Sequence, residues 1–162
     1  MANLIIIRGN SASGKTTTAK LIQKHLGSKT LLISQDVVRR EMLATNDRAG
    51  NLSINLIQEI AAYGLAHCQN TIIEGILSKE VYGQMLCQLV RSADHTQAYY
   101  YDLPFEETVQ RHQGRAKIAE FGEAELKRWW LSHDTLDIPE EKVIPQIWQQ
   151  TKIVQWILER IP

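Results

Sequence analysis

Cysteine is scarce in this sequence: only Cys68 and Cys87 are present, and they stand too far apart for a C-x-x-C motif. Both lie among apolar residues in helical-looking stretches, where a free thiol behaves as a small buried hydrophobe. The five histidines also lack the spacing of metal ligands. We therefore expect two buried free thiols and no histidine-based metal site.

An excess of charge is absent as well, because 18 basic residues balance 18 acidic ones. Nucleic-acid-binding proteins usually carry a basic face or stripe, so this balance argues against a nucleic-acid partner, although it is compatible with a local basic cleft. No apolar run approaches the length of a membrane span, and the N-terminal apolar run is too short for a signal peptide. We expect a soluble, cytoplasmic protein.

Repeats, low-complexity tracts and linkers are also missing, which favours one domain over residues 1–162. Short apolar runs alternate instead with helical stretches, and this pattern indicates an α/β fold with a parallel sheet covered on both faces. We expect strands at 4–7, 30–34, 71–74, 96–101 and 142–144, and helices at 15–26, 36–43, 53–69, 79–90, 104–115 and 147–160.

The most informative segment is residues 9–16, Gly-Asn-Ser-Ala-Ser-Gly-Lys-Thr, which fits G-x-x-x-x-G-K-[ST] at every fixed position. A predicted strand precedes it and a predicted helix follows, which is the context that this phosphate-binding motif requires. The backbone N–H groups of such a loop, at the positive end of a helix dipole, bind phosphate without side chains. The expected nucleotide-binding residues are Gly9, Asn10, Ser11, Ala12, Ser13, Gly14, Lys15, Thr16 and Thr17.

Individual residue types fit this chemistry. Gly9 allows a tight turn out of the strand, and Gly14 allows close approach of the backbone because it has no Cβ. Lys15 brings a positive charge to the terminal phosphates, and the Thr16 hydroxyl is a hard oxygen ligand suited to Mg²⁺. We expect Asp36 and Glu74 to join Thr16 around the metal.

Several polar residues follow predicted strands, and the carboxyl ends of parallel strands meet at one edge of the sheet, where ligands bind. Gly9, residues 34–36, Glu74 and Asp102 are therefore expected around one cleft. Glu74 could order water around Mg²⁺ or contact substrate; alternatively, it is a structural acid at a strand end.

Asp36 precedes Arg39 and Arg40 by three and four residues, which places all three on one helix face or adjacent ones. A carboxylate near Mg²⁺ and a phosphate could accept the proton of an attacking hydroxyl. Asp is also a preferred helix N-cap, so capping is the alternative. One of the two arginines would grip substrate or the transferring phosphate, and we expect the other to be solvated.

Arg111 and Arg115 lie four residues apart on a predicted helix and project the same way. Arginines that close over a transferring phosphoryl group neutralise its developing charge. The charged stretch that follows fits a lid, over about residues 111–135, that excludes water. An ordinary basic helix end is the alternative. Trp129 and Trp130 could stack on a base or sugar, but packing is the commoner role of tryptophan.

Four segments together resemble the small P-loop kinases that include chloramphenicol phosphotransferase, the zeta-toxin kinases and the kinase half of phage polynucleotide kinase. Many bacterial kinases of this group are classed as AAA-domain proteins. The segments are residues 9–16, Ser-Gln-Asp-Val-Val-Arg at 34–39, Thr-Ile-Ile-Glu-Gly at 71–75, and Tyr-Asp-Leu-Pro-Phe-Glu-Glu-Thr-Val-Gln-Arg-His-Gln-Gly-Arg at 101–115.

The resemblance implies a three-layer P-loop NTPase fold, with a five-stranded parallel sheet, the glycine-loop strand in its middle and a small helical lid. It implies ATP and Mg²⁺ as cofactors. It places the catalytic aspartate at Asp36, a substrate-side arginine at Arg39, and lid arginines at Arg115 and Arg111. Relatives often have Asp where this chain has Glu74.

The sequence therefore predicts an ATP-dependent kinase that transfers the γ-phosphoryl group to a hydroxyl of a small molecule. A polynucleotide 5′-hydroxyl kinase is one alternative, although neutral charge disfavours it. A non-enzymatic ATP-binding regulatory protein is another. A GTPase would need a guanine-reading Asn-Lys-x-Asp segment, which the sequence lacks.

Overall fold

The computed structural model describes residues 1–114 and 120–162. Its strands are β1 (Asn3–Gly9), β2 (Thr30–Ser34), β3 (Asn70–Gly75), β4 (His95–Tyr101) and β5 (Glu141–Ile144). Its helices are α1 (Lys15–Leu26), α2 (Leu52–His67), α3 (Lys79–Ser92), α4 (Phe105–Gln113), α5 (Glu123–Trp129) and α6 (Gln150–Leu158), and the π-helical segment η1 (Val37–Met42) follows β2. The predicted strands are all present.

The strands form one parallel sheet in the order β2-β3-β1-β4-β5. The glycine-loop strand β1 is central, as predicted, and all its residues are buried. A strand covered on both faces reads as a continuous apolar run, which explains the sequence of residues 4–7. The register places Glu74 beside Ile7 of β1 and Ser34 of β2, so the carboxyl ends of these strands lie together.

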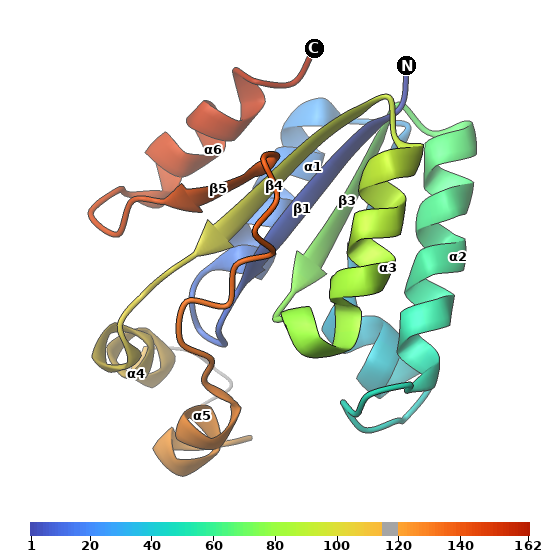
Figure 1. Ribbon diagram of the computed structural model, residues 1–162. Coiled ribbons are helices and arrows are strands. Elements are labelled where there is room, and N and C mark those ends of the chain that lie inside the picture. Colours follow the sequence, from blue (N-terminus) through green and yellow to red (C-terminus); the bar gives the residue numbers. More distant parts are fainter. Residues whose placement is uncertain (115–119) are drawn as a thin grey trace.

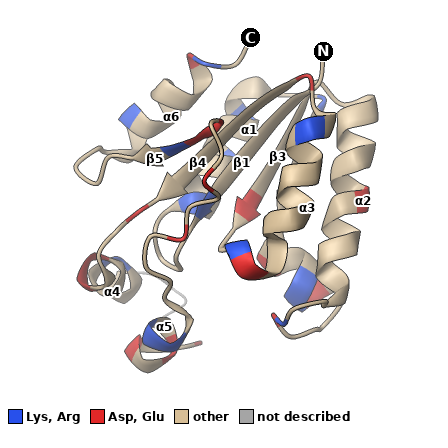
Figure 2. Ribbon diagram, viewed as in Figure 1, with Lys and Arg blue, Asp and Glu red and all other residues tan. Residues whose placement is uncertain are grey.

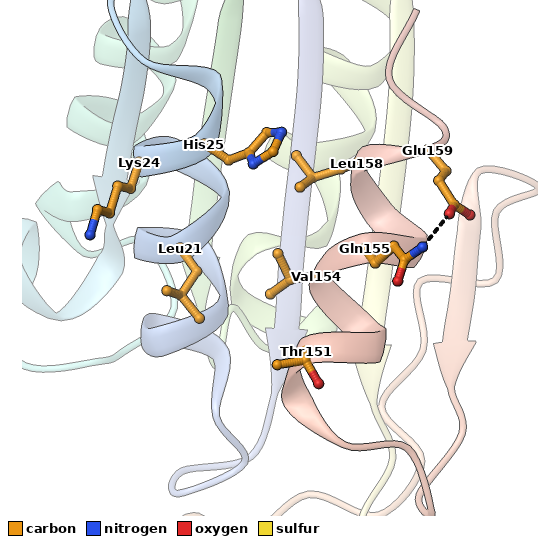
Figure 3. Close-up of a pocket in the computed structure, with 8 residues that line it drawn as sticks. All are labelled: Leu21, Lys24, His25, Thr151, Val154, Gln155, Leu158 and Glu159. Carbon is orange, nitrogen blue, oxygen red and sulfur yellow. Dashed lines mark hydrogen bonds between the residues drawn. The ribbon is translucent and has the colours of Figure 1, made fainter.

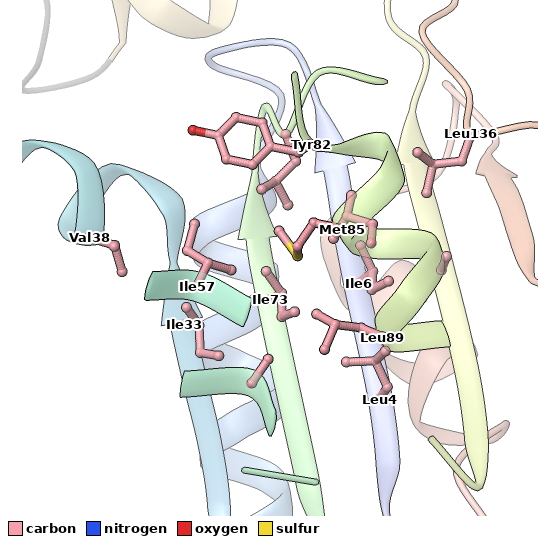
Figure 4. Close-up of a cluster of buried hydrophobic side chains, with 14 residues drawn as sticks. Leu4, Ile6, Ile33, Val38, Ile57, Ile73, Tyr82, Met85, Leu89 and Leu136 are labelled. Carbon is pink, nitrogen blue, oxygen red and sulfur yellow. The ribbon is translucent and has the colours of Figure 1, made fainter. Parts of the chain in front are cut away.

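Alternate residues of β1 serve two separate cores. Leu4 and Ile6 pack with α2 and α3 on one face of the sheet (Figure 4). Ile5 and Ile7 pack with α1 and α6 on the other face. The result is a three-layer α/β arrangement, in which α4, α5 and η1 gather at the carboxyl ends of the strands while both chain termini lie at the opposite end (Figure 1).

One local prediction gains detail and two need correction. Residues 36–43 are helical, but η1 is a π-helix, with the Leu43 N–H bonded five residues back to Val38. The closing helix α6 begins at Gln150 rather than near residue 147. Cys68, directly after α2, and Cys87, on α3, are free but only half-buried.

The described residues include no helix that is both long enough and apolar enough to cross a membrane.

Candidate active site

The glycine-rich loop leaves β1 through a turn that only glycine fits. Gly9 has a φ of 145°, and a Cβ there would lie 2.7 Å from the Tyr101 Cβ and 2.9 Å from its carbonyl oxygen. The positive φ angle and the short distances to Tyr101 each exclude a residue with a side chain at this position. The tight turn that the sequence predicted is therefore enforced by the neighbouring strand β4 as well as by the backbone angle.

The loop presents unpaired backbone donors at the start of α1. Apart from Lys15, the N–H groups of residues 12–17 reach no backbone carbonyl in the described part of the chain, and no side chain caps α1. Gly14 has a φ of 104°, which favours glycine, and a Cβ there would be in ordinary contact with the Arg111 Nη1 and the Tyr101 hydroxyl, both 3.9 Å away. Backbone N–H groups without partners at a helix N-terminus form an anion-binding cradle.

Lys15 lies folded over this cradle with only 7% of its surface exposed. Its Nζ donates to the Asn10 carbonyl oxygen at 2.7 Å and to the Ser13 Oγ at 3.3 Å. The ammonium group is thus held at the mouth of the loop, where it can exchange a neutral carbonyl for a phosphate oxygen.

Thr16 and Glu74 meet across the sheet edge. The Thr16 Oγ1 donates to both carboxylate oxygens of Glu74, at 3.1 Å each. Glu74 is 3% exposed. A hydroxyl beside a buried carboxylate is a hard oxygen pair suited to Mg²⁺, which usually takes one or two protein oxygens and completes its shell with phosphates and water. In residues 1–114 and 120–162, no group of three His, Cys, Asp or Glu could hold a metal ion.

One hollow, the loop hollow, opens over the cradle with a volume of about 730 Å³. It is lined by residues 12–17, Tyr101, Arg111 and residues 146–150. The Arg111 Nη1 donates to the Ser13 carbonyl oxygen at 2.8 Å, while its Nε donates to Glu107 at 2.9 Å. The predicted lid arginine Arg111 therefore lies directly against the phosphate loop.

Tyr101 lines the loop hollow and shares a hydrogen bond of 2.6 Å with the Thr18 hydroxyl. Burial raises the pKa of Tyr101 above its usual value, and the hydrogen bond with Thr18 opposes this only in part. The phenol is therefore neutral at physiological pH, and no anionic tyrosine repels a phosphate in the hollow.

A second hollow, the Asp36 hollow, has a volume of about 500 Å³. Its wall includes Asp36, Arg39, Arg40 and Asp47 on one side, and Arg128, Trp129 and Leu131 on the other. Lys15 and Thr16 line both hollows. The two spaces therefore meet at the residues predicted to hold the terminal phosphates and the metal.

Asp36 projects into the second hollow with its side chain 48% exposed. It makes no capping hydrogen bond to η1, so the contacts give no support to the N-cap alternative. Its Oδ1 lies 3.5 Å from the Arg39 Nη2 and 3.6 Å from the Arg40 Nε. Arg39 and Arg40 both line the hollow, but the Arg39 side chain is only 14% exposed whereas that of Arg40 is 40% exposed, so Arg40 is the more solvated of the two.

The structure does not bring every candidate into this cleft. Arg115 lies outside the described residues. Asp102 was expected beside Glu74, but it lines a separate hollow and pairs with the Nδ1 of His133 at 2.5 Å. Thr17 is exposed at the edge of the loop hollow. Trp130 packs edge-to-face on Phe105, with ring centroids 6.1 Å apart.

Sequence reasoning missed two supporting contacts. The Asn10 side chain, expected only as part of the loop, also binds the backbone of Leu131. Asp47 accepts from the Tyr82 hydroxyl at 2.7 Å and from the Gln35 Nε2 at 3.2 Å, and these bonds hold its carboxylate at the wall of the Asp36 hollow. Neither contact has a sequence signal, because the partners lie far apart along the chain.

A third hollow, of about 970 Å³, lies between α1 and α6 (Figure 3). Leu21 on α1 faces Val154 and Leu158 on α6 across it, and Gln155 donates to Glu159 at its rim at 2.8 Å. It contains no residue of the glycine-rich loop. It is therefore not part of the candidate active site.

Comparison with known structures identifies the same fold. The chain is similar to an APS kinase, CysC, of Mycobacterium tuberculosis, solved with AMPPNP and APS, at 15% identity and a TM-score of 0.72, covering 98% of this chain and 96% of the other. It is also similar to a gluconokinase of Sinorhizobium meliloti at 15% identity and a TM-score of 0.70, covering 97% and 90%. A candidate kinase of Chloroflexus aurantiacus shares 21% identity with a TM-score of 0.69, covering 98% and 94%.

No curated protein sequence matches the chain. The AAA domain family, however, matches residues 4–136, which include the glycine-rich loop, Asp36, Glu74 and α5. This match spans most of the chain and agrees with the parallel sheet, the central loop strand and the paired hollows. The chain therefore belongs to the AAA domain family and has the fold of the small P-loop kinases.

Proposed function

We propose that this protein is an ATP-dependent kinase that transfers the γ-phosphoryl group to a hydroxyl of a small molecule. The observation that carries the proposal is the meeting of the two hollows at Lys15 and Thr16. A donor in the loop hollow and an acceptor in the Asp36 hollow would have their reacting atoms at this junction. Bringing two reactants together in this way removes much of the entropic cost of the reaction.

The loop hollow would hold the nucleotide. The N–H groups of residues 12–17 and Lys15 would bind the β- and γ-phosphates, and Arg111 would neutralise charge that develops during transfer. The hollow continues along residues 146–150 toward Trp148, which leaves space for the base and ribose beyond the phosphates.

Thr16 and Glu74 would hold Mg²⁺, with Asp36 close to its water shell. Bound there, the ion would supply Lewis-acid stabilisation of the phosphate oxygens. The hydroxyl-carboxylate pair fits this role, since both groups offer hard oxygen ligands at the junction of the hollows.

In the transfer step, the acceptor hydroxyl oxygen forms a bond to the γ-phosphorus while the bond from that phosphorus to the β–γ bridging oxygen breaks. ADP leaves with the electron pair of the broken bond. Asp36 accepts the hydroxyl proton, and Arg39 orients the acceptor or the transferring group beside it. Closure of the predicted lid over the site would exclude water and so prevent loss of phosphate by hydrolysis.

The similar structures support a small acceptor. They include a gluconokinase and an APS kinase, and the latter was solved with AMPPNP and APS. The Asp36 hollow has a volume of about 500 Å³, which lies within the range of small-molecule sites.

The test is a screen for ATP-dependent phosphorylation of nucleosides, sugars, nucleotide sugars and aminoglycoside-like alcohols, read by mass spectrometry as the gain of one phosphoryl group. We expect at least one compound to gain it with wild-type protein and none with Asp36→Asn. Salt-sensitive phosphorylation of a 5′-hydroxyl oligonucleotide would favour the polynucleotide alternative. ATP binding without transfer or hydrolysis across the panel would favour a regulatory ATP-binding protein.

A further inference from the structure

Three arginines from two distant segments face the Asp36 hollow. Arg39 and Arg40 come from η1, and Arg128 comes from α5, almost ninety positions later in the chain. Figure 2 shows basic residues on both elements, at the carboxyl end of the sheet. The fold thus concentrates guanidinium groups at one place in a chain whose formal net charge is zero.

The carboxylates of the same hollow do not neutralise these arginines. Glu74 accepts from Thr16, and Asp47 accepts from Tyr82 and Gln35. Among the described carboxylates that line the hollow, only Asp36 forms ion pairs with these arginines, and its distances of 3.5 Å to Arg39 and 3.6 Å to Arg40 are long for charge-assisted hydrogen bonds. The arginine donors therefore exceed the acceptors that the described wall of the hollow supplies.

Individual hydrogen bonds and ion pairs also show more arginine donors than acceptors. The Arg39 Nη1 donates to the Thr45 carbonyl oxygen at 3.2 Å, but its Nε is buried and has no hydrogen-bond partner among the described residues. Arg128 forms no ion pair with any residue of 1–114 or 120–162. Guanidinium donors that the protein leaves without acceptors favour a ligand that brings acceptors.

Trp129 holds two of the arginines in place. The guanidinium carbons of Arg40 and Arg128 lie 6.0 Å and 5.8 Å from the centroid of its ring. Phe121 packs edge-to-face against the same indole, with centroids 5.2 Å apart, and fixes its plane. A cation–π contact restricts a guanidinium group while its N–H donors stay available, which favours bidentate contacts by Arg40 and Arg128.

We propose that the acceptor carries a carboxylate or phosphate group besides its reactive hydroxyl, and that Arg39, Arg40 and Arg128 bind this anion. The inference rests on the proposed kinase function, because it assigns the acceptor class of the same site. Guanidinium groups match the bidentate geometry of both anions, so the shared chemistry is a planar or tetrahedral oxyanion on a small hydroxyl compound. Trp129 and Phe121, which line the same hollow, would contact the uncharged part of the acceptor.

The first test measures anion binding without catalysis. The loop hollow is filled with saturating Mg·AMPPNP, and the arginine Nε–H resonances are followed by NMR during titration with sodium phosphate or sodium acetate at constant ionic strength. We expect saturable shifts of Arg39, Arg40 and Arg128, and the two titrations show which anion binds more tightly. Shifts no larger than those caused by added chloride would overturn the proposal.

Matched variants locate the site. Arg128→Gln, on the exposed side of the hollow, is expected to weaken anion binding about tenfold, because a hydrogen bond to a charged group is lost. Lys127→Gln on the same helix removes an equal charge outside the hollow and is expected to leave the dissociation constant within twofold. Equal weakening by both variants would show that anion binding depends on the overall charge of the protein, and it would contradict a specific anion site.

The second test uses matched acceptor pairs with ATP: glycerol against glycerol 3-phosphate, glycerol against glycerate, and adenosine against adenosine 5′-monophosphate. We expect kcat/KM to be about tenfold higher or more for the anionic member of a productive pair, and Arg128→Gln to raise its KM.

Preference for the neutral member would refute the anion site and leave the kinase function intact. Affinity that rises with oligonucleotide length would assign the arginines to a nucleic acid. Failure of Mg·AMPPNP to bind would instead refute the proposed kinase function.

Discussion

The side-chain amide of Asn10 binds both backbone groups of Leu131. Its Nδ2 donates to the Leu131 carbonyl oxygen at 2.6 Å, and its Oδ1 accepts from the Leu131 N–H at 2.7 Å. Asn10 is 4% exposed and lies within the glycine-rich loop. One residue of the phosphate loop thus fixes the point at which the chain leaves α5.

Asn10→Ala is expected to detach this point from the loop. The loss of two hydrogen bonds, each contributing about 1 kcal/mol, should speed amide hydrogen exchange at Leu131 by tenfold or more. We also expect slower transfer at saturating ATP. Asn55→Ala, at an exposed position of α2, is the control. Unchanged exchange at Leu131 in the Asn10 variant would show that the contact does not hold the segment.

Lys15→Ala is expected to weaken binding of Mg·ATP and to reduce transfer together, because the ammonium group at the loop would contact the terminal phosphates. A charge-assisted contact of this kind corresponds to a loss of about tenfold or more in affinity. Isothermal titration calorimetry measures it, with the exposed Lys20→Ala on the same helix as control. Wild-type affinity in Lys15→Ala would defeat the assignment.

Asp36→Asn is expected to keep ATP affinity within a few-fold and to reduce transfer by about a hundredfold or more, since a positioned base commonly contributes this much. The amide keeps the shape of the side chain but cannot accept the proton. Glu41→Gln, on the same η1 segment but outside the hollow, should behave as wild type. Equal turnover of Asp36→Asn and wild type would exclude Asp36 as the base.

Removal of divalent metal with EDTA is expected to abolish transfer without changing the circular dichroism spectrum, because the sheet and its two cores need no metal. Glu74→Gln should raise the Mg²⁺ concentration at half-maximal activity, since one hard anionic ligand near Thr16 is lost. Glu80→Gln, at an exposed position of α3, serves as the matched control. An unchanged Mg²⁺ requirement in Glu74→Gln would argue for a purely structural role of Glu74.

Stability is expected to fall as the pH rises from about 10 to 12. Burial raises the pKa of Tyr99 to about 12, and it also raises the pKa values of Tyr82, Tyr100 and Tyr101. Above pH 10 the unfolded chain therefore loses phenol protons that the folded chain retains, which favours unfolding. Melting temperatures would follow the loss of stability, and absorbance at 295 nm would follow the ionisation of the tyrosines. Tyr99→Phe should give a shallower decline of the melting temperature with pH. Ionisation of all tyrosines near pH 10 with the fold intact would contradict this.

The layout of strands and the phosphate loop could be predicted because their signals are local. Residues 4–7 form a continuous apolar run and residues 9–16 carry the loop motif, so no distant contact is needed to recognise them. The type of η1 was not predictable in this way: helical periodicity does not distinguish an α-helix from a π-helix, which in this case holds Arg39 and Arg40 beside Asp36.

Long-range polar contacts escaped prediction for a different reason. Asp102 follows β4 as expected, but it pairs with His133 and does not join Glu74. The direction in which a side chain points at the end of a strand depends on the loop that follows. The same limitation applies to the wall of the Asp36 hollow. Trp129 was expected mainly to pack, and the stacked arginines that surround it come from segments that no spacing rule connects.

Arg8, in the central strand, is fully buried, and it binds Asp134 at 2.8 Å, Glu141 at 2.9 Å and the Leu77 carbonyl oxygen at 3.1 Å. The chain after α5 is therefore anchored to the middle of the sheet, independently of the residues that line the Asp36 hollow. Substitutions on the exposed face of α5 are therefore expected to alter the wall of the Asp36 hollow without loosening the attachment of this segment to the central strand.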